Sequence, residues 1–116
     1  MKNLLCITIL ATTLIFSSGT IAGEDSSCHF HGNKIATEEI ITNCAVERKE
    51  LLITQGKIDP SWKTIEPEKA ELVEGKKGKE WLITFTNPAV TDKMKEKLYM
   101  FFTAPGNFIA ANFTGK

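Results

Sequence analysis

This 116-residue chain lacks an excess of charge of either sign, because 14 lysine and arginine residues balance 14 aspartate and glutamate residues. Without a basic surplus it has little means of holding a phosphate backbone, which argues against a dedicated nucleic-acid binder. It also lacks a Cys-x-x-Cys redox pair, a glycine-rich phosphate loop and any internal repeat. These absences leave no recognisable catalytic motif and favour a protein that is not an enzyme.

Long hydrophobic runs are also scarce, since residues 4–16 form a single one that is too short to span a membrane. Lys2 precedes this run, and small residues ending in Ala22 follow it. This order is typical of a secretory signal peptide. Cys6 lies too near the start for a lipoprotein signal. The sequence therefore predicts a signal peptide over residues 1–22, cleaved after Ala22, and export to an oxidising compartment.

The exported chain is predicted to hold one domain, because removal of the signal leaves 94 residues. Residues 23–34 are polar and are interpreted as a flexible arm, and residues 35–116 as a single α+β domain. Cys28 and Cys44 are the two cysteines that remain, and in a small exported protein they predict one disulfide. With 15 residues between them, such a bond would stabilise the fold by about 3 kcal/mol in the chain-entropy account.

The pattern after the arm predicts one long helix, with Thr37 as its N-cap and Gly56 as its stop. Charged residues of its second half are assigned to the side that faces water: Glu47, Arg48, Lys49 and Glu50. The apolar side is predicted to comprise Ile41, Cys44, Ala45, Leu51 and Leu52, with Ile40 flanking it.

Four segments after the helix are predicted to be strands. Residues 64–74 read as an edge strand because they contain Pro67, and residues 81–86 alternate with a period of two. Residues 98–103 are apolar on both faces, which predicts a central strand covered on each side. Residues 108–113 pair back through a turn centred on Pro105 and Gly106. The predicted fold is α+β, with one long N-terminal helix packed on a four-stranded antiparallel meander sheet.

Several stretches resemble an uncharacterised family of small exported bacterial proteins. Members typically carry a His-x-His-Gly near the mature N-terminus, which residues 29–32 match. The other matching stretches are GKIDPSW (56–62), EWLITFTNP (80–88), LYMFF (98–102) and AANFTGK (110–116). The resemblance covers nearly the whole mature chain and favours the bacterial periplasm as its destination, but it implies no activity.

A second likeness, in the order of elements and the terminal hairpin, is to PepSY-type domains of exported and membrane-associated bacterial proteins. Those domains often act as inhibitory or regulatory binding modules. The likeness implies a PepSY-like protein-interaction or inhibitor domain that binds a partner through its sheet, as an analogy at the level of the fold.

One cluster has the residue types of a metal site, namely Cys28, His29 and His31. Imidazole and thiolate are ligands for zinc or copper, and alternating positions in an extended segment place the two histidines on one side. Cys28 or Cys44 would then supply sulfur. The cluster therefore predicts a small binding module that handles a transition-metal ion through its N-terminal arm.

Other readings of these residues remain open. Cys28 and Cys44 can instead form the disulfide, leaving His29 and His31 solvated or binding a metal weakly beside it. The helix carboxylates are interpreted as a solvated face rather than an acid/base pair. The aromatic side chains of the strands are interpreted as core, although an exposed patch of them on the sheet would mark a partner site. The aromatic residues considered are Trp81, Tyr99, Phe101, Phe102, Phe108 and Phe113.

Overall fold

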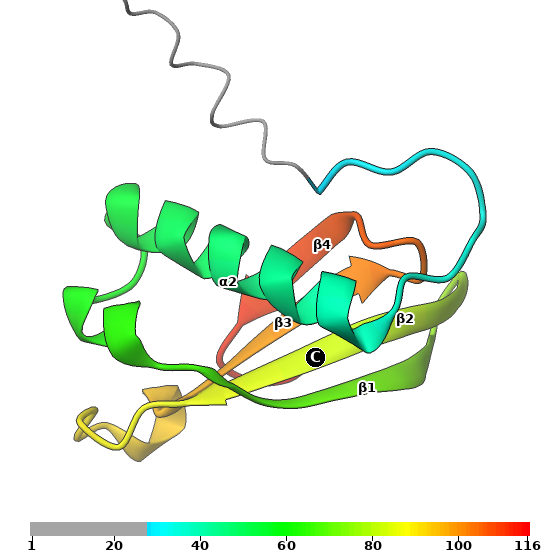
Figure 1. Ribbon diagram of the computed structural model, residues 1–116. Helices are drawn as coiled ribbons and strands as arrows, with labels where there is room; N and C mark the ends of the chain where they lie inside the picture. The colour runs from blue at the N-terminus through cyan, green and yellow to red at the C-terminus, as the bar shows by residue number, and fades with distance from the viewer. Residues whose placement is uncertain (1–27) are drawn as a thin grey trace, which may run out of the picture.

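The computed structural model describes residues 28–116, so the predicted signal peptide and the first residues of the arm lie outside the described part. Residues 28–116 form one α-helix and one antiparallel sheet, which confirms the predicted α+β class (Figure 1). The elements are α2 (Glu38–Thr54), η1 (Pro60–Thr64), β1 (Pro67–Gly75), β2 (Gly78–Thr86), η2 (Lys93–Lys95), β3 (Lys97–Thr103) and β4 (Phe108–Asn112). The helix precedes all the strands, but at residues 38–54 it lies in the middle of the chain rather than at its N-terminus.

Both ends of α2 have the predicted caps. The Thr37 hydroxyl accepts a hydrogen bond from the Ile40 N–H at 3.2 Å, and two acidic residues occupy the first turn. Gly56 follows the helix with a φ of +74°, a conformation that favours glycine. None of the helices among residues 28–116 has the length and apolar character needed to cross a membrane.

The buried side of α2 carries Ile41, Cys44 and Ala45, as predicted, but it also carries Lys49. The assignment of Lys49 to the solvent face is wrong, because its side chain is only 2% exposed. Its ammonium group donates to the carbonyl oxygens of Lys63 and Ile65, at 3.0 and 2.7 Å. These acceptors compensate for part of the cost of burying the charge.

The sheet is a meander in the order β1-β2-β3-β4, with antiparallel neighbours throughout. The register places large apolar residues of the two central strands opposite one another on one face. The pairs are Trp81 with Phe102, Ile83 with Met100, and Phe85 with Leu98. All six side chains are buried, and α2 lies across this face to complete the core (Figure 1).

The opposite face of the sheet is open. The prediction that β3 is covered on each side is wrong, because its buried residues alternate with half-buried ones. Tyr99 and Phe101 are the half-buried aromatics of this face, and no helix or strand of residues 28–116 lies over them. The C-terminal tail gives partial cover, since a Cβ built at Gly115 would lie 3.4 Å from the Tyr99 ring.

The strand β1 lies at the edge of the sheet, as predicted. Pro67 begins β1 at the edge of the sheet, where its missing N–H costs no ladder bond, as predicted. The turn before β4 is closed one residue earlier than predicted, by the hydrogen bond from the Gly106 N–H to the Thr103 carbonyl. Gly106 therefore follows the turn's central pair, with a φ of +118°.

Candidate functional site

The arm is tied to the helix by a disulfide between Cys28 and Cys44. Cys44 is fixed by its place on the buried side of α2, where it is 2% exposed. Both sulfur atoms are consumed by this bond, so neither cysteine offers a thiolate to a metal in this state. Of the two interpretations of Cys28, the structure contains the disulfide.

A second attachment holds the arm against the turn before β4. The Phe30 N–H donates to the Asn107 side-chain oxygen at 2.7 Å, and the Asn107 amide nitrogen donates to the Phe30 carbonyl at 2.8 Å. The Phe30 ring packs on Gly106 so closely that a Cβ there would lie 2.8 Å from it. The Ala36 N–H donates to the Ala104 carbonyl at 2.9 Å. The described part of the arm is thus attached to the fold at three points.

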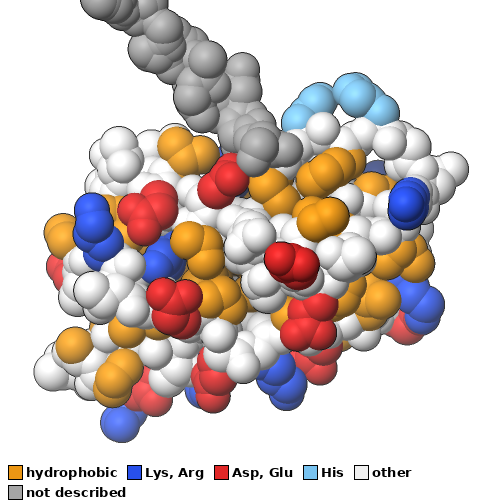
Figure 2. Space-filling model, viewed as in Figure 1, with side chains coloured by type: hydrophobic (Ala, Val, Ile, Leu, Met, Phe, Trp, Pro, Cys, Tyr) orange, Lys and Arg blue, Asp and Glu red, His pale blue; other side chains and the backbone are white. Residues whose placement is uncertain are grey.

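His29 and His31 stand immediately before and after Phe30 in the sequence, and the rings of both are exposed (Figure 2). The ring centroids are 4.9 Å apart and the ring planes are nearly perpendicular, at 87°. A metal–imidazole bond is about 2.0–2.1 Å long, so two imidazoles that share one ion have centroids about 5 Å apart. The centroid distance of the two histidines fits a shared ion, and it also fits an edge-to-face contact between the two rings themselves.

The ligand set around the two histidines is small. Within residues 28–116 there is no group of three or more His, Cys, Asp or Glu side chains placed to hold a metal ion. Two imidazoles with water completing the coordination sphere suit copper or zinc, and they bind less tightly than a closed three- or four-ligand site.

The open face of the sheet carries the second candidate site, a hollow of about 1080 Å³. It lies where the β1–β2 hairpin, the turn before β4 with its flanking strands, the C-terminal tail and Asn33 of the arm meet. Its apolar lining includes Phe101, Pro105 and Ile109. Lysines surround it, namely Lys76, Lys77, Lys79 and Lys116. We refer to it below as the lysine-rimmed hollow.

The aromatic residues divide between the two faces of the sheet. Trp81 and Phe102 are buried, and Phe108 and Phe113 pack against the core, which confirms the core interpretation for these four. Tyr99 and Phe101 lie on the open face instead.

Two functional features were missed by the sequence reasoning. The buried position of Lys49 had a signal, because it stands four and eight residues after Ala45 and Ile41 on the helix. Burial lowers the pKa of the Lys49 ammonium group, and the nearby Glu50 and Glu66 carboxylates partly oppose this. The clamp between Asn107 and Phe30 had no signal, since 77 residues separate its partners.

Comparison with protein families gives a match over the whole chain. The model of a family described as a family of unknown function, DUF6488, matches residues 1–116. No curated protein and no solved structure matches the chain significantly.

Proposed function

We propose that this chain, which belongs to the DUF6488 family of unknown function, is a small exported, non-enzymatic binding module that handles a transition-metal ion through its N-terminal arm. The ligands are the imidazoles of His29 and His31, and the ion is copper or zinc. The observation that carries the proposal is the 4.9 Å separation of the two exposed rings on a segment attached to the fold.

The attachments favour binding because they restrict the arm before the ion arrives. A ligand pair held near its bound geometry loses less conformational entropy on binding than the same pair on a free chain. In this proposal Cys28 contributes through its disulfide to Cys44, which anchors the arm, and not as a ligand.

The experiment is a calorimetric titration of the disulfide-bonded mature protein with Cu²⁺ and with Zn²⁺. We expect one equivalent of at least one ion to bind, and we expect His29→Ala with His31→Ala to abolish the binding while the melting temperature stays unchanged. Lys34→Ala is the matched control, since it alters an exposed arm residue that is not a metal ligand. Equal binding by the double variant and the control would contradict the proposal.

A second function is favoured by a different observation, the open face of the sheet. We propose as the alternative that the protein is a PepSY-like interaction or inhibitor domain that binds a partner through this face. Its half-buried Tyr99 and Phe101 and the lysine-rimmed hollow support this function. Substitution of the two histidines tests the metal-binding function alone, because it leaves the open face intact.

A further inference from the structure

The lysine-rimmed hollow has an apolar floor. Ile109 of β4 is 45% exposed, and Phe101 is only half-buried. Pro105 adds a further apolar surface. Exposed apolar area in a concave site favours an occupant that contributes an apolar group of its own.

The rim of the hollow is basic. Four lysines line it against two glutamates, Glu74 and Glu80. Lys79 is paired with Glu74 at 2.6 Å. Lys76, Lys77 and Lys116 form no ion pair with any of residues 28–116. The four lysines exceed the two glutamates of the lining by two charges, and this local excess favours an acidic occupant.

The size of the hollow decides between a small anion and a longer ligand. At about 1080 Å³ the hollow is as large as a site for a drug-sized molecule, which is far larger than a small anion fills. Nucleic acid is disfavoured by the balance of 14 basic and 14 acidic residues over the chain. A stretch of polypeptide combines the required apolar and acidic groups.

We propose that the lysine-rimmed hollow binds an acidic, extended segment of a partner protein. An apolar side chain of that segment packs on Phe101 and Ile109, and its carboxylates pair with Lys76, Lys77 and Lys116. This inference rests on the second function proposed above, binding through the open face, and it names the chemistry of the partner. It is independent of the histidines of the arm.

The test is a selection of random 12-residue phage-displayed peptides on the mature protein, followed by affinity measurement of the enriched peptides. We expect enriched peptides to be net acidic and to carry an apolar residue. Lys76→Gln, Lys77→Gln and Lys116→Gln together should weaken their binding roughly tenfold, because each exposed charge pair contributes little alone. Raising the salt concentration should weaken it further.

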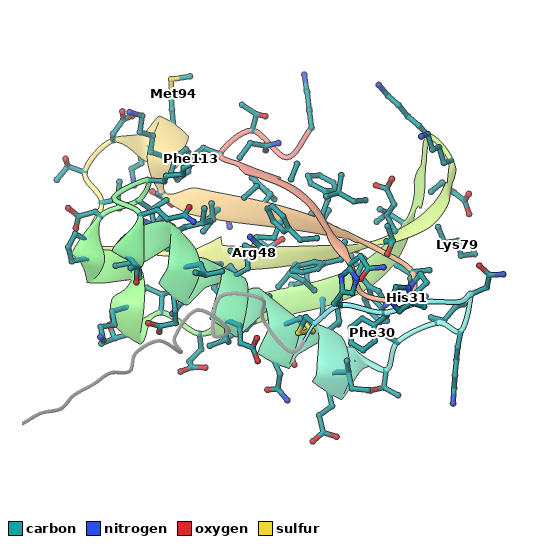
Figure 3. All side chains as sticks on the ribbon, turned by 90° about the horizontal axis from the view of Figure 1, so that it is seen from above. Phe30, His31, Arg48, Lys79, Met94 and Phe113 are labelled. Atoms are coloured by element: carbon teal, nitrogen blue, oxygen red, sulfur yellow. A yellow bond between two sulfur atoms is a disulfide. The ribbon has the colours of Figure 1, made fainter. Side chains whose placement is uncertain are left out.

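Matched controls exist on surfaces that do not line the hollow. Lys57→Gln, Lys63→Gln and Lys95→Gln remove the same charge from exposed positions elsewhere. Ile109→Glu places a carboxylate on the floor and should abolish binding of acidic peptides. Its control is Met94→Glu, because Met94 is 81% exposed and lies at the opposite end of the molecule from Lys79 (Figure 3). Melting curves confirm that each variant is folded.

The outcomes separate the inference from the function on which it rests. The proposal of an acidic partner is overturned if the enriched peptides are neutral or basic. It is also overturned if they bind the triple lysine variant as tightly as the control variant. Either result leaves binding through the open face in place. If no peptide is enriched, or if Ile109→Glu and Met94→Glu bind equally, both the inference and the alternative function are contradicted.

Discussion

Lys49 is the residue whose chemistry depends most on its surroundings. Its ammonium group is buried under the helix, donates to two carbonyl oxygens, and lies 5.8 Å from the centre of the Phe85 ring. The two carbonyls belong to Lys63 and Ile65, at the end of η1 and just beyond it. Lys49 thus joins the helix to the segment that leads into β1.

We expect Lys49→Met to lower the free energy of unfolding by about 1–3 kcal/mol at pH 7, because the two carbonyl oxygens lose their donor. Urea denaturation measures this change. Thr54→Val is a milder control, since it removes one exposed hydroxyl bond on the same helix. A Lys49→Met variant as stable as the native protein would show that the buried bonds contribute nothing.

The same residue predicts a dependence on pH. Because burial lowers the pKa of Lys49 in the folded state below 10.5, the unfolded chain binds more protons between the two pKa values. The contribution of Lys49 to the free energy of unfolding therefore rises with pH through this range and is lost as pH falls through the folded pKa. Urea denaturation of the native protein and Lys49→Met between pH 7 and 10.5 should show their difference growing. A constant difference would contradict the shift.

At the scale of elements, the main feature is the clamp between the arm and the turn before β4. The side-chain amide of Asn107 accepts a hydrogen bond from the Phe30 N–H and donates one to the Phe30 carbonyl, as the backbone of a neighbouring strand would. The absence of a side chain at Gly106 lets the Phe30 ring pack against that turn. The clamp positions His29 and His31 on either side of Phe30.

We expect Asn107→Ala to lower the free energy of unfolding by about 1–2 kcal/mol, since two hydrogen bonds are lost. It should also increase hydrogen exchange over residues 28–36 and weaken metal binding by the two histidines. Hydrogen exchange and the calorimetric titration measure the two effects. Asn33→Ala is the control on the same arm. Metal binding that survives the loosening of the arm would show that attachment of the arm is irrelevant to the proposed site.

At the scale of the whole molecule, the disulfide closes a covalent loop over residues 28–44, which contains the described part of the arm and the first two turns of the helix. Removing it with Cys28→Ala and Cys44→Ala should lower the free energy of unfolding by about 3 kcal/mol. Chemical reduction of the native protein should give a similar loss without emptying space in the core. Urea denaturation measures both, and a loss below about 0.5 kcal/mol in the reduced protein would contradict the prediction.

Export is also a property of the whole chain. We expect the full-length chain, expressed in a bacterial host with its own predicted leader, to appear in the periplasm. Its intact mass there should equal that of residues 23–116, which begin at Gly23. Intact-mass spectrometry of the periplasmic fraction measures this. A variant with Leu10→Arg in the apolar run is the control and should remain in the cytoplasm, because the charge interrupts that run. Retention of the unmodified chain inside the cell would contradict the predicted signal peptide.

The sequence by itself determined the elements and their order. Alternation of apolar residues, the Thr37 cap and the Gly56 stop are local signals. The helix ends match them, and the strands match them to within three residues at each end. The disulfide was also predictable, because only Cys28 and Cys44 lie outside the predicted leader.

Only the tertiary structure decided which face of the sheet the single helix covers, and therefore that Tyr99 and Phe101 line an open face. It alone joined Asn107 to Phe30, and Lys49 to the carbonyls of Lys63 and Ile65. The physical reason is that these contacts connect residues far apart in the chain, whose meeting depends on packing rather than on local propensity. The lysine-rimmed hollow belongs to the same class, since four separate segments of the chain have to converge to form it.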